Sequence, residues 1–221
     1  MINKIIDEAL IAHDFTKVHE TDLTSFYIRE SGSAIRFAIL HKLDQLSSPA
    51  ELNASINQSA PDSLLSHPTF KKNCDLICIY HLNKLAEFKD HEEQIFEIEE
   101  DPHFFKKYIL YYSDTEESAI QNYSFKRLVA TIADKRQFSD YKSNPLTATQ
   151  YSVAAKVFIK LPFLVLPFTR GELVSLRLQA AEAVAEAGLD ATYKTVQKLS
   201  GNNVDELIKE LIENELENNA N

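Results

Sequence analysis

Residues 94–113 read QIFEIEEDPHFFKKYILYYS, and this stretch decides how the middle of the chain is organised. Apolar and acidic residues alternate over residues 95–99, which predicts a strand with its acidic side chains on one face. Asp101 and Pro102 follow as an N-cap residue and a proline at the first helical position, so they predict the start of a helix. The apolar run 108–112 fits either a continuation of that helix or another strand.

Local signals before this stretch predict a small sheet flanked by helices. Residues 2–14 carry an apolar stripe at helical spacing, and Ser31-Gly32-Ser33 between two alternating segments predicts a β-hairpin. Ser48-Pro49-Ala50-Glu51 combines an N-cap, a proline at N1 and a capping box, which predicts a helix ending near Ser59. The run 75–80 is too apolar for a surface strand, so we expect it centrally in the sheet.

The signals after Ser113 are mostly helical. Ser113 and Glu116 form a second capping box, and prolines at 162 and 167 predict an extended, buried connector over 161–168. Helical periodicity predicts helices over 115–137, 146–160, 172–187 and from Asn203 to Leu216. We therefore predict an α+β fold, with a small N-terminal mixed sheet with helices in an α/β-like portion (1–113), followed by a mainly helical portion (114–221). The two portions are expected to pack as one composite domain.

Composition restricts the function classes. The formal net charge is −10, with acid-rich stretches at 87–101 and 202–221, which argues against a freestanding nucleic-acid binder. Only four glycines occur, and the chain contains neither GxxxxGK[ST] nor GxGxxG, so nucleotide hydrolysis and a nucleotide cofactor are not expected.

Cysteine usage and the apolar segments indicate the compartment. Cys74 and Cys78 provide no disulfide framework, as is typical of a reducing compartment. The first fifteen residues lack a signal-peptide pattern, and the longest apolar stretch, 163–168, is too short to cross a bilayer. We expect a cytoplasmic protein.

Two groups of side chains could hold a metal ion. Asp75 followed by Glu97-Ile98-Glu99 is similar to the carboxylate pattern of a Mg²⁺-dependent nuclease, although Glu99 stands where such enzymes have lysine. Cys74 and Cys78 would lie about 13 Å apart on a strand, too far for one zinc ion, so core thiols are expected. A metal-dependent nuclease using the three carboxylates is kept as an alternative, and no catalytic or metal-binding residue is assigned.

Two surfaces have the pattern of a partner-binding site. Residues 97–108 form an acidic and then basic surface, and the C-terminal helix carries an aliphatic stripe that either docks on its own domain or on a partner. Charge reversal at Lys106 and Lys107 is expected to weaken assembly and leave the fold intact. The candidate partner-binding residues are Glu97, Glu99, Asp101, Phe104, Phe105, Lys106, Lys107, Tyr108, Leu207 and Leu211.

Residues 73–113 also resemble a known family. The motifs are Asp75-Leu76-Ile77, then Glu99-Glu100-Asp101-Pro102, then Phe104-Phe105-Lys106-Lys107-Tyr108. They are similar to the middle component of ABC three-component systems, the Lamassu-type anti-phage and anti-plasmid defence operons. The resemblance implies a non-enzymatic accessory subunit. Its partners would be an SMC-like or Rad50-like ATPase and an effector protein such as a nuclease, with DNA reached only through the complex. A general adaptor in an unrelated complex is a third alternative.

Overall fold

The computed structural model describes residues 1–167, 176–189, 193–194, 208–209 and 212, and the chain divides into two compact units, Met1–Phe168 and Thr169–Asn221. Unit 1 contains α1 (Ile2–Ala12), β1 (Thr16–Glu20), β2 (Thr24–Ser31), β3 (Ala34–Leu43), α2 (Pro49–Ser59), α3 (Asp62–Leu65), β4 (Cys74–Leu82), a 3-10 turn η1 (Leu85–Glu87), α4 (Phe88–Glu100), β5 (Lys106–Ser113), α5 (Asp114–Ala119), α6 (Phe125–Ile132), α7 (Lys135–Ser143) and α8 (Gln150–Lys160). Unit 2 contains α9 (Leu176–Glu186).

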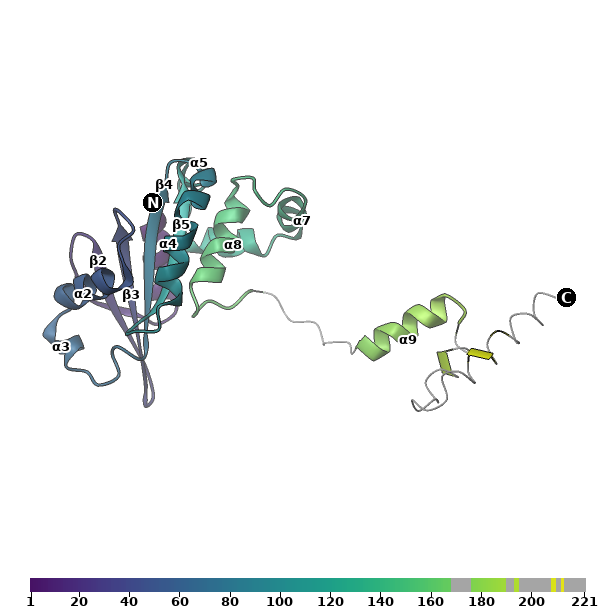
Figure 1. The fold of residues 1–221 in the computed structure, drawn as a ribbon, viewed down its shortest axis with the longest axis horizontal. Coiled ribbons are helices and arrows are strands. Elements are labelled where there is room, and N and C mark those ends of the chain that lie inside the picture. Colours follow the sequence, from purple (N-terminus) through teal and green to yellow (C-terminus); the bar gives the residue numbers. More distant parts are fainter. Residues whose placement is uncertain (168–175, 190–192, 195–207, 210–211, 213–221) are drawn as a thin grey trace. The chain divides into compact units, whose positions relative to one another are not determined.

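In the described residues, β1 to β5 form one sheet whose strands follow the order of the sequence (Figure 1). β1, β2 and β3 pair antiparallel, whereas β3, β4 and β5 pair parallel. The parallel pairs need crossover connections, which contain α2 and α3 in one case and α4 in the other. The predicted α+β fold with an N-terminal mixed sheet is confirmed. Packing of the two predicted portions as one composite domain stays a prediction.

Helices cover both faces of the sheet. One buried cluster joins the sheet to α1, α6 and α8, and a second joins its other face to α2, α3 and α4. β4 runs between these clusters, and its side chains from Cys74 to Tyr80 are buried. A strand covered on both faces is apolar throughout rather than alternating, so the central position predicted for 75–80 is confirmed. Cys74 and Cys78 are free buried thiols, as predicted.

Turns and caps predicted from local sequence are found in the structure. Ser31 pairs with Ala34 across the β2–β3 hairpin, and Gly32 takes a φ of 59°, a left-handed conformation that glycine adopts without a Cβ penalty. The Ser48 and Ser113 side chains each accept the backbone N–H of the residue at N3. The carboxylate of that N3 glutamate accepts the backbone N–H of the cap residue. Both capping boxes are therefore confirmed.

The strand predicted over 95–99 is wrong, because these residues belong to α4. Ile95 and Ile98, three positions apart, are the buried residues of this helix, whereas Phe96 is 44% exposed. The helix predicted from Asp101 and Pro102 is also wrong. α4 ends at Glu100, and the chain enters β5 at Lys106, which identifies the ambiguous apolar run as a strand.

The helical segments after β5 are shorter than predicted. Residues 115–137 form parts of α5, α6 and α7, and α8 begins at Gln150. The connector after α8 is buried at Leu161 and Phe163, but Val165 is 82% exposed, so the predicted burial of the whole connector is wrong. In unit 2, Gly188 follows α9 with a φ of 71°, as a C′ glycine does. Most of the predicted helix from Asn203 lies outside the described residues.

No helix in the described residues has the length and apolar character needed to span a bilayer.

Side chains hydrogen-bond three backbone groups of β5, which is the last strand of the sheet. Glu99 Oε1 accepts the Ile109 N–H at 2.7 Å, and Lys156 Nζ donates to the Tyr111 carbonyl at 3.3 Å. Glu116 Oε2 accepts the Ser113 N–H at 3.2 Å. The outer side of β5 is therefore occupied by side chains of α4, α5 and α8.

His41 on β3 provides a first prediction, about pH. Its ring Nδ1 lies 2.8 Å from Thr24 Oγ1, and burial lowers its pKa below the ordinary 6.5. Between about pH 6.5 and the lower folded-state pKa, His41 is protonated in the unfolded chain but neutral in the folded one. The free energy of unfolding therefore decreases as the pH falls through this range. His41→Gln should reduce that decrease, as measured by urea unfolding at about pH 7.5 and about pH 5.5. The exposed His103→Gln is the control. An undiminished decrease in His41→Gln would contradict the assignment.

Candidate functional site

The loop between α4 and β5, residues 101–105, carries the central part of the predicted partner-binding surface. Proline has no backbone N–H and cannot continue a helix, so Pro102 directly after the C-cap residue Asp101 fixes the end of α4. The Asp101 carboxylate bends the chain back, because its Oδ1 accepts the His103 N–H at 3.3 Å. Asp101 thus bonds a backbone N–H two residues on, the local interaction typical of an Asx turn.

A buried ion pair holds this loop. Lys107 Nζ lies 2.7 Å from Asp101 Oδ2, and the two side chains are 0% and 10% exposed. The same ammonium donates to the carbonyls of His103 at 2.6 Å and Phe105 at 3.2 Å, and Asn53 Nδ2 donates to Asp101 at 3.1 Å. Burial alone would raise the pKa of the Asp101 carboxyl, but the hydrogen bonds from Lys107, Asn53 and His103 lower it.

Phe104 and Phe105 point to opposite sides of the loop. Phe105 is 2% exposed and its ring lies 5.7 Å from that of Phe70, centroid to centroid, in the core under α2 and α4. Phe104 is 47% exposed, and Lys71 Nζ lies 4.7 Å from its ring centroid. Phe104 also has a φ of 64°, which is uncommon outside glycine, asparagine and aspartate. The loop holds an aromatic ring in solvent on a strained backbone.

An open hollow of about 520 Å³ surrounds this ring. Lys106, which is exposed, and Tyr108, which is partly buried, line it from β5. Lys72 lines it from the segment before β4, while Glu99, Glu100 and Asp101 line it from the end of α4. Acidic side chains, basic side chains and the aromatic ring of Phe104 therefore lie together around this hollow. We call Phe104, Lys106, Tyr108 and the neighbouring Lys71 and Lys72 the loop surface.

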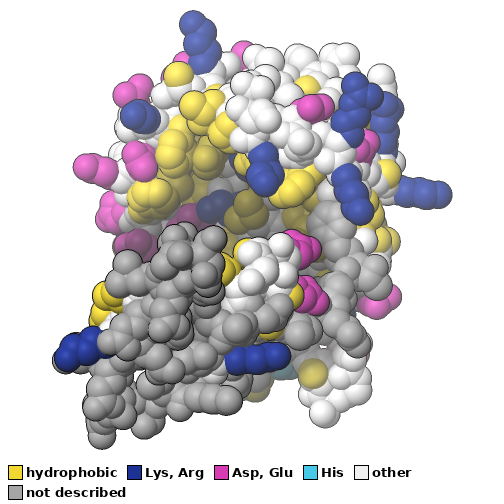
Figure 2. All heavy atoms as spheres, turned by 90° about the vertical axis from the view of Figure 1, so that its right-hand side faces the viewer, with side chains coloured by type: hydrophobic (Ala, Val, Ile, Leu, Met, Phe, Trp, Pro, Cys, Tyr) yellow, Lys and Arg dark blue, Asp and Glu magenta, His cyan; other side chains and the backbone are white. Residues whose placement is uncertain are grey.

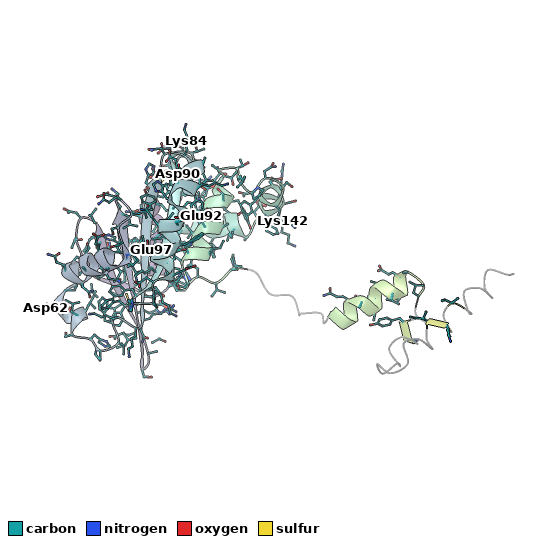
Figure 3. The ribbon with its side chains drawn as sticks, in the orientation of Figure 1. Asp62, Lys84, Asp90, Glu92, Glu97 and Lys142 are labelled. Carbon is teal, nitrogen blue, oxygen red and sulfur yellow. The ribbon has the colours of Figure 1, made fainter. Side chains whose placement is uncertain are left out.

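The remaining predicted site residues have different environments. Glu97 is exposed on α4 with Asp90 and Glu92 along the same helix (Figure 3). Glu99 is partly buried, accepting the Ile109 N–H and, at 2.5 Å, the Lys160 ammonium. Because Lys107 is buried in the ion pair with Asp101, we now expect charge reversal there to disrupt the loop, and the expectation of an intact fold is kept for the exposed Lys106 alone. Leu207 and Leu211 lie outside the described residues.

The three carboxylates of the nuclease alternative do not converge. Asp75 lies on β4, 3% exposed, where Arg36 Nη2 approaches its Oδ2 to 2.8 Å. Desolvation raises the pKa of Asp75 despite that arginine. Glu97 and Glu99 lie on α4, not on the neighbouring strand that the nuclease pattern requires. Among the residues that the structure describes, no three His, Cys, Asp or Glu side chains are grouped as a metal site would require.

Two further features could not be assembled from sequence. One is an apolar groove of about 490 Å³ beside Phe88, Tyr111, Tyr141 and Leu146, with the ion pair between Glu116 and Lys156 in its lining. Figure 2 shows hydrophobic side chains gathered around a hollow on one face of unit 1. The other is a basic hollow beside β2 and β3, whose cations come from separate segments. The only sequence signal for it is the net positive stretch after residue 104, which contributes one of its cations.

The comparisons with known proteins bear on the same region. No curated protein and no solved structure matches the chain. Residues 36–139 match the family model described as ABC-three component (ABC-3C) system Middle Component 1, a range that begins in β3, ends in α7 and contains the whole α4–β5 loop. The match supports the resemblance at the level of a middle component of an ABC three-component system.

Proposed function

We propose that this chain is the middle component of a Lamassu-type ABC three-component defence system, acting in the cytoplasm against phages or plasmids. In this role it is a non-enzymatic accessory subunit that bridges or restrains an effector, such as a nuclease, on an SMC-like ATPase. The observation that carries the proposal is the family match over residues 36–139. The geometry agrees with it, because the matched range presents an exposed, rigidly held aromatic side chain beside lysines.

The loop surface is suited to protein binding rather than to chemistry. Interfaces are anchored by a few aromatic and charged residues whose shape is fixed before the partner arrives. Phe104 is such a residue, because the Asp101–Lys107 ion pair and the packed Phe105 fix the backbone on both sides of it. A left-handed backbone conformation is unfavourable for a residue other than glycine, and such residues cluster at functional sites. The conformation of Phe104 therefore supports a functional role for its side chain.

The proposal is tested by co-purifying the tagged chain with the products of its native operon and identifying them by mass spectrometry. We expect a large SMC-like ATPase together with a second protein, the effector. Recovery of this chain alone, folded and monodisperse, would overturn the proposal. Recovery of an unrelated complex would favour the general adaptor instead.

Phe104→Gly separates binding from folding. Glycine removes the exposed ring and relieves the left-handed backbone, which costs an L-residue about 1 kcal/mol. The variant should therefore be as stable as the parent or more stable by up to about 1 kcal/mol, while the recovery of partner proteins falls. Urea unfolding and quantified co-purification measure the two effects.

Phe138→Ala on α7 is the matched control, because Phe138 has the same exposed fraction of 47% and lies outside the loop surface. It should leave partner recovery unchanged. The assignment of Phe104 fails if its variant retains full partner recovery, or if both variants lose it equally.

A further inference from the structure

Charged side chains form a row across four strands at one end of the sheet. Arg29 on β2 lies directly opposite Arg36 on β3, and Asp75 on β4 lies directly opposite Lys106 on β5. Opposite residues share a face, and Asp75 is also opposite Ala38, two residues from Arg36 on the same side of β3. All four side chains are therefore on one face. Lys72 joins them from the segment before β4.

This row contains more positive charge than the fold neutralises. Like charges directly opposite each other on paired strands are unfavourable, yet two arginines occupy such a pair. Asp75 is the one acidic residue in the lining, and Arg36 already engages it at 2.8 Å. Within the described part of the chain, Arg29, Lys72 and Lys106 form no salt bridge. Arg29 instead lies 4.8 Å from the Phe15 ring centroid.

These residues line an open hollow of about 450 Å³, which we call the basic hollow. Lys72 and Lys106 line both this hollow and the one around Phe104, so the basic hollow adjoins the loop surface. In a chain with a formal net charge of −10, this local excess of cations is the reverse of the overall charge. An anionic group entering here would meet a guanidinium and two ammonium groups that have no carboxylate partner within the described residues.

We propose that the basic hollow binds a short, extended acidic segment of a protein partner, with an apolar side chain of that segment placed against Phe104. This inference rests on the proposed function, because it names the chemistry of a partner in the same complex. From β2 to β5 the row covers three strand spacings, about 14 Å in all. An extended segment of about four residues covers that length at about 3.3 Å per residue and places alternate carboxylates on the row.

The composition of the surroundings favours a polypeptide over a nucleic acid. Nucleic-acid binding requires cations along a run of phosphates. Here the basic hollow is bordered by Glu99, Glu100 and Asp101 in the adjoining hollow, and Asp75 lies within its lining. A polypeptide can place its acids in the basic hollow and an apolar or basic residue beyond it, which a phosphate backbone cannot do.

The first test uses the full-length chain and a fluorescein-labelled octapeptide of alternating glutamate and serine, with fluorescence anisotropy as the readout. We expect binding at low salt and roughly a tenfold loss of affinity in Lys72→Glu/Lys106→Glu. Both changes are at exposed lysines, which leaves the ion pair between Arg36 and the buried Asp75 intact. Lys135→Glu/Lys142→Glu reverses two exposed lysines of α7, where Figure 3 labels Lys142, and is the charge-matched control that should retain the parent affinity.

Three results of this experiment would overturn the proposal. The first is no binding of the glutamate peptide beyond that of a glutamine–serine peptide of equal length. The second is an equal loss of affinity in the control Lys135→Glu/Lys142→Glu. The third is tighter binding of a labelled fifteen-nucleotide single-stranded DNA than of the peptide, lost in Lys72→Glu/Lys106→Glu, which would assign the basic hollow to nucleic acid.

A second test uses the assembled complex. A photo-crosslinking amino acid placed at position 72 should react with an acidic segment of a partner, while one at position 142 should not. A complex that assembles normally, with position 72 crosslinked only to segments without acids, would overturn this inference and leave the proposed function standing. Failure of the parent chain to recover any operon product would overturn the proposed function, while the peptide titration still decides the occupant of the basic hollow.

Discussion

Lys107→Met should lower the free energy of unfolding by about 3 kcal/mol, because it removes the cation from a buried ion pair and leaves the Asp101 carboxylate behind. The carbonyls of His103 and Phe105 lose their ammonium donor in the same variant. Methionine keeps the length and apolar character of the lysine stem, so the loss reports mainly on the charge. Urea unfolding followed by circular dichroism measures it, since the chain has no tryptophan.

Lys106→Met is the adjacent control. Successive strand residues point to opposite faces, so Lys106 is exposed, and its replacement should change the free energy of unfolding by less than about 0.5 kcal/mol. Adding Asp101→Asn to Lys107→Met removes the orphaned carboxylate as well and should recover a large part of the loss. Equal losses in the two single lysine variants, or no recovery in the double variant, would contradict the ion-pair assignment.

Glu116→Gln should have an effect of similar size, about 3 kcal/mol, because it removes the anion from a second largely buried ion pair. Glu116 is 0% exposed, accepts the Ser152 hydroxyl at 3.0 Å and lies 2.6 Å from Lys156 Nζ. Glutamine keeps one acceptor oxygen, which can still accept the Ser113 N–H, and its NH2 group can donate to the Ser152 hydroxyl oxygen, but the Lys156 ammonium is left without its counter-ion. Glu117→Gln, at a neighbouring and partly exposed residue that pairs with the N-terminal amine, should lose no more than about 1 kcal/mol.

The pH dependence of this loss provides a sharper measurement. Burial lowers the pKa of Lys156 below its ordinary 10.5, and Glu116 opposes that shift, so its removal should lower the pKa further. Between the folded-state and unfolded-state pKa values the unfolded chain binds more protons, so the free energy of unfolding rises with pH. The loss in Glu116→Gln should therefore shrink between about pH 7 and about pH 10. A loss that stays constant over this range would show that the charge of Lys156 is not its cause.

Sequence succeeded where the determining interaction is local. The capping boxes at Ser48 and Ser113 are complete within four residues, and the hairpin at Gly32 depends on one backbone conformation. It failed at residues 95–99, where Phe96 and Ile98 fit the alternation of a short strand, whereas Ile95 and Ile98 fit the spacing of a helix. Including Phe88, seven residues before Ile95, gives the helical spacing, because both residues pack against the core under α4.

The candidate site could not be predicted in the same way, because it depends on contacts between segments that are far apart in the sequence. Lys106 and Lys107 are chemically identical, and their opposite environments follow only once the segment is known to be a strand. Asp101 was predicted to cap a helix, and its carboxylate does accept a backbone N–H, but the following chain extends into β5. Arg29, Arg36 and Lys72 come together through strand register, which depends on pairing between segments far apart in the chain.

The hydrogen bonds along the outer side of β5 have a consequence for the chain before it meets any partner. A strand at the border of a sheet is a template on which a second copy can add its own strand, the first step of aggregation. Here Glu99, Lys156 and Glu116 already occupy the Ile109, Tyr111 and Ser113 groups that such an addition would need. With these three groups already bonded, β5 offers fewer free backbone donors and acceptors for edge-to-edge association between copies of the chain.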